Sequence, residues 1–558
     1  MFRPGKLSNI VFLSIVILIG GFLRFYKLDW GEGYFFHPDE RNITSVSVSI
    51  TPPLDAAFFT KGTFAYGNLI PYLAYMVNFF VNLITPDAYI ISNFSSVTLL
   101  LRMISATFSV LTIIISYLIG KKFWHKRVGY LAASITTFSP GLIQSAHFGT
   151  FEATLVFLYL LVFYFSASLI TEGRVRNFFF SILSLGLASA IKINSLILLP
   201  PLLFALFLSK KLRYGFKEKI IIGSVGFAAM ALMTILFSPY YLTSDFRRMV
   251  NYEQQLVRGE TDVFYTRQFF NTKPILFQLT KITPFITNHL VTIFFPVLFF
   301  YLIYNFLKKI IKNRFFSRTL QVDIFLIIFV SALFVPHALL FTKWTRYMIP
   351  TIPFLILLVM VGFERFVYRW RTAIYTSLIL TSVVWTSAFM SVYLNRDTRL
   401  AASEWIYQNI ADNSYLLSET GNVFDIPIPP KEKVVKKKFT VKNFDFYNLE
   451  KNNVLFNELI IDLERADYIL IPSRRIFGGM GSFPDKHPLV VRYYQLLFSE
   501  KLGFKEIKRF TSYPRLLSFE FPDEIAEETW SVFDHPVVRI YKKVSPMNTF
   551  EYEKLLKI

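Results

Sequence analysis

VTLLLRMISATFSVLTIIISYLIG, at residues 97–120, is an apolar run with a single charged side chain, Arg102. A helix that crosses the hydrocarbon core of a bilayer needs about 20 predominantly apolar residues. The run is long enough to cross a membrane once, so it predicts a transmembrane helix. A short cluster of Lys and Arg follows it, as happens after several of the other apolar runs.

Further runs of this kind fill most of the first 394 residues, and together they predict about eleven crossings. The first, residues 7–28, is not followed by a small-residue cleavage site, so we interpret it as a retained span. Residues 178–209 are too long for one simple span and contain Lys192 and a Pro-Pro pair, which predicts a broken helix or two short ones. The remaining runs are residues 67–84, 128–146, 151–170, 220–242, 286–307, 322–341, 347–363 and 373–394.

The composition is that of a membrane protein. Hydrophobic residues make up 53% of the chain and charged residues only 17%, against about 25% charged in soluble domains. There is no cysteine, which excludes disulfides, thiolate nucleophiles and Cys-ligated metals. The net charge is +21. Much of it lies in short loops between apolar runs, so we attribute it to topology and anionic lipid headgroups rather than to nucleic acid.

The basic loops predict the orientation of the spans. Residues 210–219, 308–318 and 364–371 carry the densest Lys and Arg clusters, which the positive-inside rule assigns to the cytoplasm. The N-terminus is then cytoplasmic, and the long loops at residues 29–66 and 243–285 face outward. The C-terminal part of the chain also faces outward.

One basic loop, residues 121–127 (KKFWHKR), falls on the outer side in this arrangement. A second arrangement moves it inside. In it, residues 67–84 lie in or on the membrane as part of the first external loop, which then extends to residue 96, and residues 178–209 cross twice. Both arrangements have eleven crossings, and the sequence leaves the choice between them open.

The composition of the sequence changes after residue 394, where charged and polar residues become frequent. We therefore divide the chain into a transmembrane domain, residues 1–394, and an extracytoplasmic α/β domain of about 160 residues, 395–558. The second domain has strand-like segments at residues 415–418, 468–471 and 537–541. Helix-like segments lie among them at residues 401–410 and 489–502.

The segment FFHPDER, residues 35–41, follows the first span and holds His37, Asp39 and Glu40 within four positions. Pro38 restricts His37 to extended conformations, so a helix is expected to begin at the acidic pair. Two carboxylates beside a low-dielectric membrane are candidates for a general base on an acceptor hydroxyl or amine. Together with His37 they are also candidate ligands of a divalent cation. An ordinary polar loop with acidic residues at a helix N-terminus is the alternative.

An Asp-Glu pair just after the first span resembles the GT-C superfamily of glycosyltransferases. The closest likeness is to the branch of protein O-mannosyltransferases and aminoarabinose transferases that use phospholipid carriers. Four further segments are similar to segments of that family, in the same order, and the resemblance covers about residues 8–394. Glu152 stands where the family usually has Asp. The segments are residues 100–111 (LLRMISATFSVL), 147–155 (HFGTFEATL), 188–200 (ASAIKINSLILLP) and 346–353 (RYMIPTIP).

The resemblance implies a multi-pass glycosyltransferase of the plasma or inner membrane. Such an enzyme takes a sugar from a polyprenyl-phosphate carrier and passes it, with inversion, to a protein hydroxyl, a lipid or a glycan on the outer side. By this likeness Asp39 and Glu40 are the catalytic residues: Asp39 is the base, and Glu40, with Glu152, orients the acceptor or the donor. A divalent metal ion is a further candidate, with Asp39, Glu40 and Glu152 as its ligands.

The departing lipid phosphate requires fixed positive charge at the site where negative charge develops. A lysine inside a membrane segment is costly and functional by default, so Lys192 is a leading candidate. Histidines of the first loop and of the 147–155 segment are further candidates for substrate binding. The complete set of candidate substrate-binding residues is His37, Lys61, His147, Glu152, Lys192, Arg247, Arg248, Arg267, Arg346 and Tyr347.

A transporter or flippase for a lipid-linked glycan is the competing function, because Lys192 and the basic external loops would suit it. Transporters more often have paired halves with interrupted spans at matching positions. The chain has one interrupted run, residues 178–209, and no matching half. A receptor with membrane anchors would not require eleven crossings. We therefore favour the transferase.

Overall fold

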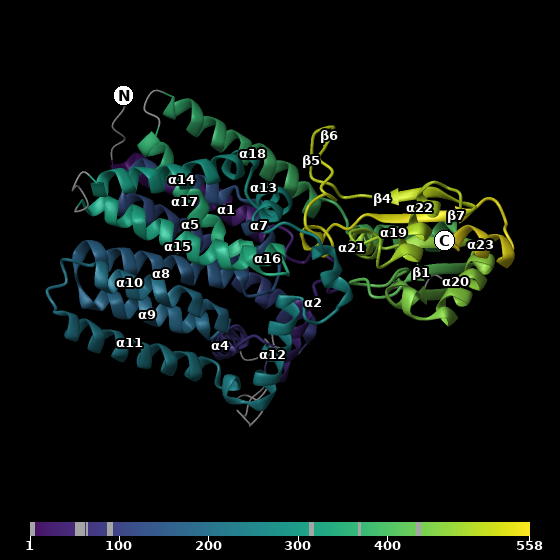
Figure 1. The fold of residues 1–558 in the computed structure, drawn as a ribbon, viewed down its shortest axis with the longest axis horizontal. Helices are drawn as coiled ribbons and strands as arrows, with labels where there is room; N and C mark the ends of the chain where they lie inside the picture. Colours follow the sequence, from purple (N-terminus) through teal and green to yellow (C-terminus); the bar gives the residue numbers. More distant parts are fainter. Residues whose placement is uncertain are drawn as a thin grey trace.

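The computed structural model describes residues 6–50, 62, 65–85, 93–311, 317–366, 370–430 and 437–557. A bundle of long helices forms most of the molecule, and a smaller region built on a β-sheet lies at one end of it (Figure 1). Within the described residues, seven helices are long and apolar enough to cross a membrane, and shorter apolar helices accompany them. The predicted fold class, a polytopic helical membrane protein with a C-terminal α/β region, is confirmed.

The bundle helices coincide with the apolar runs of the sequence. Several begin at a side chain that caps the first turn; Asn93, for example, accepts a hydrogen bond from the Ser96 amide at 2.8 Å. The helices of the bundle are α1 (Lys6–Phe25), α5 (Phe94–Phe123), α6 (Lys126–Thr137), α7 (Pro140–His147), α8 (Glu152–Glu172), α9 (Val175–Ser189), η2 (Ile193–Leu198), α10 (Leu199–Leu208), α11 (Phe216–Phe237), α14 (His289–Ile311), α15 (Arg318–Leu339), α16 (Thr345–Met348), η6 (Ile349–Thr351), α17 (Ile352–Phe366) and α18 (Arg371–Leu394).

Shorter elements cover the end of the bundle that faces the sheet region (Figure 1). Helix α12 is amphipathic: its apolar Phe246 and Leu256 are buried while Arg247 and Arg248 are exposed. The short elements are α2 (Pro38–Ser49), α4 (Leu69–Ile84), η3 (Pro239–Leu242), α12 (Ser244–Arg258), η4 (Phe264–Phe269), η5 (Gln278–Ile282) and α13 (Thr283–Ile286).

The long run at residues 178–209 forms a helical hairpin. Helix α9 runs one way, the chain turns at Lys192, and η2 with α10 runs back. The two open ends of the hairpin meet at Gly173, where a Cβ would lie 2.5 Å from the Lys211 carbonyl carbon. Gly173 also has φ +71°, a conformation that glycine adopts at no steric cost. The run therefore crosses the bundle twice.

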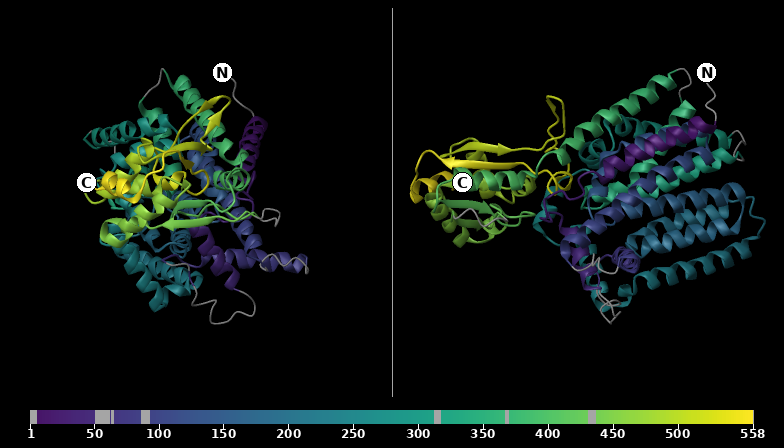
Figure 2. Two further views of the ribbon diagram at one scale, coloured as in Figure 1. Left: turned by 90° about the vertical axis from the view of Figure 1, so that its right-hand side faces the viewer. Right: turned by 180° about the vertical axis from the view of Figure 1, so that it is seen from behind.

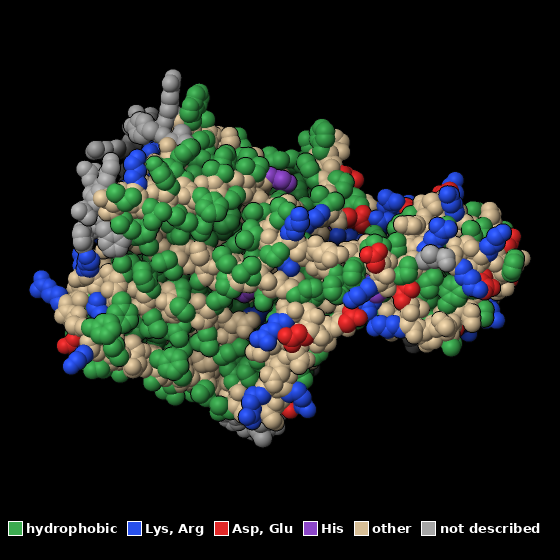
Figure 3. All heavy atoms as spheres, viewed as in Figure 1, with side chains coloured by type: hydrophobic (Ala, Val, Ile, Leu, Met, Phe, Trp, Pro, Cys, Tyr) green, Lys and Arg blue, Asp and Glu red, His purple; other side chains and the backbone are tan. Residues whose placement is uncertain are grey.

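The basic loops gather at one end of the bundle, which we call the basic end. Lys122 forms an ion pair with Glu172 at 2.8 Å, and His125 lies 3.1 Å from Glu364. These contacts bring loop 121–127 to the loops that precede α9 and α18. Figure 3 shows Lys and Arg side chains at this end and a broad apolar surface beside it.

Helix α4 lies across the long helices rather than parallel to them, at the opposite end of the bundle (Figures 1 and 2). Residues 67–84 lying across and residues 178–209 forming a hairpin agree with the second of the two arrangements described above, which stays a prediction. Loop 121–127 then shares the side of the other basic loops. That this side is cytoplasmic stays a prediction from the positive-inside rule.

The C-terminal region has a five-stranded sheet in the order β2-β1-β3-β7-β4. Strand β1 is parallel to β2 and β3, whereas β7 is antiparallel to β3 and β4. The three segments that the sequence predicted as strands form β1, β3 and β7 in the structure. The division of the chain at residue 394 remains a prediction. The elements here are α19 (Thr398–Asn409), β1 (Tyr415–Glu419), β2 (Thr440–Phe444), η7 (Phe446–Lys451), α20 (Asn453–Arg465), β3 (Tyr468–Ile471), α21 (Arg475–Gly481), α22 (Pro488–Phe498), β4 (Phe504–Phe510), β5 (Arg515–Leu516), β6 (Phe519–Glu520), η8 (Glu528–Trp530), β7 (Val538–Lys543) and α23 (Thr549–Leu556).

A buried charge cluster joins the C-terminal region to the bundle. His535 contacts Asp534 through Nδ1 at 2.5 Å and Asp523 through Nε2 at 2.9 Å. Asp534 also accepts hydrogen bonds from Gln144 and Tyr393 of the bundle, at 3.0 and 2.9 Å. Burial alone would lower the pKa of His535, but the two carboxylates raise it to about 10. The imidazolium therefore holds Asp534, and Asp534 makes the bonds to the bundle.

Candidate active site

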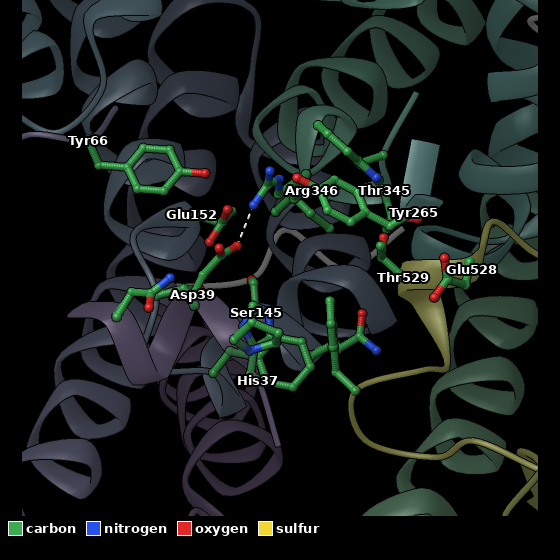
Figure 4. A pocket seen from close by; sticks show the side chains of 18 of the residues that line it. His37, Asp39, Tyr66, Ser145, Glu152, Tyr265, Thr345, Arg346, Glu528 and Thr529 are labelled. Atoms are coloured by element: carbon green, nitrogen blue, oxygen red, sulfur yellow. Dashed lines mark hydrogen bonds and ion pairs between the residues drawn. The ribbon is translucent and has the colours of Figure 1, made fainter. Parts of the chain in front are cut away.

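A cavity of about 420 Å³ lies between the bundle and the C-terminal region, at the end opposite the basic end. Its volume is that of a small-molecule site. Its wall includes Asp39 from α2, Glu152 from α8, Arg346 from α16 and Thr529 from η8. These side chains come from segments far apart in the sequence, and Figure 4 shows them around one space.

Asp39 and Arg346 form an ion pair at the centre of this wall (Figure 4). Burial alone would raise the pKa of Asp39, but the Arg346 guanidinium holds it below its ordinary value of 3.8. Glu152, nearly buried at the N-terminus of α8, points toward the same pair. Asp39 is therefore ionised at neutral pH.

The local sequence sets the direction of Asp39. His37 is the N-cap of α2, where its Nδ1 accepts a hydrogen bond from the Glu40 amide at 3.4 Å, and Pro38 takes the first helical position. The His37 ring packs between Phe148 and Phe533, with ring centroids 4.6 and 4.2 Å away. Burial lowers the pKa of His37, so the imidazole is neutral and accepts this bond. His37 thus starts the helix that carries Asp39.

Lys192 lies behind this wall, at the turn of the α9–α10 hairpin. Its Nζ faces the rings of Tyr347, Phe151 and Tyr66, at 4.8, 5.4 and 5.6 Å from their centroids. Among the described residues, none forms a hydrogen bond or ion pair with its ammonium. A second, small cavity is lined by Lys192 and Tyr347 together with Glu152 and Arg346, so the two cavities share the last two residues.

The fold of the chain is similar to that of an archaeal oligosaccharyltransferase, AglB from Archaeoglobus fulgidus. That structure was solved in complex with an inhibitory peptide and a dolichol-phosphate. The TM-score is 0.51 at 13% identity, over 88% of this chain and 72% of AglB. ArnT from Cupriavidus metallidurans, in the apo state, matches with a TM-score of 0.45 at 14% identity, over 85% of this chain and 94% of ArnT. No curated protein sequence matches the chain significantly.

Residues 71–241 match the family of dolichyl-phosphate-mannose-protein mannosyltransferases. Over this segment, which is less than half of the chain, the sequence is similar to that family. The matched segment includes Glu152 and Lys192, and the fold extends beyond it on both sides. The resemblance inferred from the sequence is therefore confirmed.

Glu40 does not line the cavity, contrary to the expectation that it acts beside Asp39. Its side chain is fully buried, and both oxygens accept hydrogen bonds from Arg102 at 2.7 Å. One of them also accepts from the Gly149 amide at 2.7 Å. Arg102 in turn donates to the Leu28 and Trp30 carbonyls. Glu40 therefore fixes α2 against α5 and the turn before α8, and it positions Asp39 without touching the cavity.

Four other candidates also lie away from the cavity. His147 is buried, with each ring nitrogen 2.8 Å from a backbone carbonyl and its ring stacked on Tyr393. Arg247 and Arg248 are exposed on α12. Arg267 is buried and pairs with Asp262 at 3.0 Å, so it ties η4 to its own loop. Lys61 lies outside the described residues.

The expected metal ligands do not converge. Asp39 is paired with Arg346, and Glu40 is occupied by Arg102. In the part of the chain that the structure describes, no group of three or more His, Asp or Glu side chains is arranged to hold a metal ion. The residues therefore do not fit a divalent cation bound by Asp39, Glu40 and Glu152.

The C-terminal region supplies cavity residues that the sequence did not indicate. Arg475, at the start of α21, forms an ion pair with Glu528 at 2.5 Å, and both line the cavity opposite Asp39. Gln268 donates to the other oxygen of Glu528 at 3.2 Å. No motif marks these residues, because they approach Asp39 only through the packing of two separate parts of the chain. Tyr66, Glu253 and Tyr265 precede the C-terminal region, line the same cavity and also carry no motif.

Proposed function

We propose that this protein is a glycosyltransferase that moves a sugar from a polyprenyl-phosphate carrier to an acceptor hydroxyl on the outer side of the membrane, with Asp39 as the base. One observation carries the proposal. An ionised carboxylate and two cations, Arg346 and Lys192, meet at adjoining cavities at the end of the spans opposite the basic loops. This combination suits a displacement in which a proton leaves one reactant and negative charge develops on the other.

The donor phosphate is assigned to the side of Lys192. The small cavity there is lined by two cations, Lys192 and Arg346, and by apolar residues such as Leu155 and Leu333. A lipid phosphate requires this pairing, because its charge must be neutralised while its tail stays in the bilayer. Tyr347 lies between the cations and provides a hydroxyl for a phosphate oxygen.

The acceptor is assigned to the larger cavity. Its hydroxyl oxygen attacks the anomeric carbon as Asp39 takes the hydroxyl proton. The bond between that carbon and the phosphate oxygen breaks, and the polyprenyl phosphate leaves with the electron pair. A single displacement of this kind inverts the anomeric centre. Arg475, Glu528 and Thr529 of the C-terminal region face the acceptor in this arrangement.

The comparisons support the donor class. The matched family is described by its use of dolichyl-phosphate mannose and by transfer to protein. AglB, which has the same fold, was solved with a dolichol-phosphate and a peptide. We therefore infer a lipid-phosphate donor for this chain. The test below compares three acceptor classes: a protein hydroxyl, a lipid and a glycan.

The test is a transfer assay in vesicles. The purified protein is incubated with radiolabelled polyprenyl-phosphate mannose and each acceptor class, beside Asp39→Asn. Because general-base catalysis contributes about 10²- to 10⁴-fold, we expect the variant to lose transfer by at least about 100-fold. Donor binding, measured by equilibrium binding of the labelled lipid, should remain.

Asp245→Asn is the matched control, because Asp245 is an exposed carboxylate at the start of α12 that pairs with Arg248. Its transfer rate should equal that of the wild type. Movement of the labelled lipid across the vesicle membrane with its sugar still attached, and no transfer to any acceptor, would instead indicate a flippase.

A further inference from the structure

The C-terminal region carries a small β-hairpin whose tip is apolar and exposed. Strands β5 and β6 are joined by Leu517 and Ser518. Leu517 is 87% exposed and Phe519 69% exposed. Ile525, a few residues later, is 65% exposed. Figures 1 and 3, drawn in one view, show the hairpin projecting beside the end of α18, with an apolar tip.

The conformation of the tip does not serve the packing of the protein. Leu517 has φ +55°, in the left-handed region that two-residue hairpin turns normally fill with Asn, Asp or Gly. A leucine there is strained, and its side chain gains almost no contact with the rest of the chain. A large apolar side chain in such a place indicates a partner outside the chain.

The base of the hairpin is fixed to a membrane-spanning helix. The Arg515 amide donates to Ser391 Oγ of α18 at 2.9 Å, and Ser391 Oγ lies 3.4 Å from the Tyr513 carbonyl. Phe521, just after β6, packs edge-on against Trp385 of α18, with ring centroids 6.0 Å apart. The hairpin therefore keeps a defined height relative to α18.

That height matches the boundary of a bilayer. Helix α18 begins at Arg371, at the basic end. Ser391 is about 20 residues further on, which is about 30 Å along a helix. The hydrocarbon core of a bilayer is also about 30 Å thick. Trp385 lies below this level and is buried, with its Nε1 donating to the Phe285 carbonyl at 2.9 Å. The apolar surface of the span continues below it with Leu380, which is 57% exposed.

We propose that the β5–β6 hairpin is a membrane anchor, whose apolar tip inserts into the interfacial region of the leaflet on the cavity side. Leu517 and Phe519 contact the acyl chains, and Arg515, exposed on the same hairpin, contacts lipid phosphate. The lipid-contacting surface of the hairpin then adjoins the apolar surface of α18. The anchor also attaches the C-terminal region to the membrane, in addition to the contacts that this region makes with the bundle.

The absence of cysteine makes a direct test practical. Ser518→Cys places the sole thiol of the protein at the exposed turn, where a nitroxide spin label can be attached. Two matched sites provide the scale: Ser499→Cys, exposed at the end of α22, for water, and Leu380→Cys for lipid. Collision rates with oxygen and with a water-soluble nickel chelate are measured in vesicles of phosphatidylcholine and phosphatidylglycerol.

We expect the label at position 518 to favour oxygen over the nickel chelate, closer to position 380 than to position 499. Phe519→Asp in the Ser518→Cys background should move the ratio toward that of position 499. Phe550→Asp, at a 72% exposed phenylalanine of α23, should leave it unchanged. A label as accessible to nickel as position 499 would overturn the proposal. So would spin–spin broadening between labels, which would mean that a second copy of the chain covers the tip.

Discussion

At the scale of single residues, two adjoining cavities separate the proposed proton acceptor from the proposed phosphate site. Asp39 faces the larger cavity, Lys192 faces the smaller one, and Arg346 lines both. Arg346 is already paired with Asp39. In the proposed reaction it therefore links the protonation of Asp39 to the negative charge on the donor phosphate. Each of the three residues therefore has a test of its own.

Lys192→Met should weaken donor binding with little change in the rate at saturating donor, if the ammonium contacts the phosphate in both ground and transition states. A hydrogen bond to a charged group contributes about 1.5–3 kcal/mol, so we expect a rise of about 10- to 100-fold in the KM for the donor. The measurement is steady-state kinetics against donor concentration. Lys217→Met, at an exposed lysine of α11, is the control. A KM equal to that of the wild type would remove Lys192 from the phosphate site.

The pH profile should report the Asp39–Arg346 pair. Because the guanidinium lowers the pKa of Asp39, the base stays ionised down to pH values below its ordinary value of 3.8. Arg346→Gln removes that effect and leaves burial, which raises the pKa of Asp39. The acidic limb of kcat/KM should then move to higher pH. Arg248→Gln, at an exposed arginine, should leave the acidic limb of kcat/KM unmoved. If the limb does not move in Arg346→Gln either, it belongs to another group than Asp39.

The sequence located Asp39, Lys192 and Arg346 because each occupies a recognisable place: a loop after the first span, a membrane segment, and the start of a span. Only the family resemblance favoured Asp39 over Glu40 as the base; the residues themselves did not separate the two. Neighbouring residues of a helix point about 100° apart, so only one of the two can face the cavity. Which one does is decided by Arg102, whose guanidinium holds Glu40 on the other side.

At the scale of elements, α2 is held in place by a buried ion pair that lies within a membrane protein. Glu40 and Arg102 are both nearly inaccessible to solvent, and removal of one partner leaves the other charge buried alone. Arg102→Met should therefore destabilise the protein by about 3–5 kcal/mol. Thermal unfolding in detergent measures the loss. Arg102→Met combined with Glu40→Gln should recover part of it, and equal losses in the single and double variants would argue against the pair.

The arrangement of the spans depended on two elements that the sequence could mark but not resolve. The length and the central Lys192 of residues 178–209 indicated a break, yet only the contact of Gly173 with Lys211 makes the segment a hairpin. Helix α4 has a fully apolar sequence of 16 residues, typical of a span, and still lies across the bundle. Hydrophobicity alone does not distinguish a helix that crosses from one that lies at the interface.

At the scale of the whole molecule, the His535 cluster couples stability to pH. The pKa of His535 is raised to about 10 in the folded protein, above its ordinary value of 6.5. A raised pKa contributes stability that is complete below the unfolded value and is lost as the pH rises toward 10. Tm should therefore fall between pH 7 and pH 10 more steeply in the wild type than in His535→Gln. Parallel profiles of the two proteins would show that the imidazole carries no such charge.

The joining of the two parts is also why the C-terminal side of the cavity could not be predicted. Arg475 and Glu528 lie far along the chain from Asp39 and carry no motif. They reach the cavity because Asp534 bonds to Gln144 and Tyr393. Such a contact is a property of packing between surfaces, and periodicity along one segment carries no information about it.

The shared wall of the cavity has a consequence for how enzymes of this design diversify. The cations assigned to the lipid phosphate belong to helices that the bilayer constrains, whereas Arg475, Glu528 and Thr529 belong to a region joined to the last span by a few residues between α18 and α19. We expect recombination at that junction to change what is modified while the delivered sugar stays the same. A lineage could then acquire new targets without evolving a new donor site.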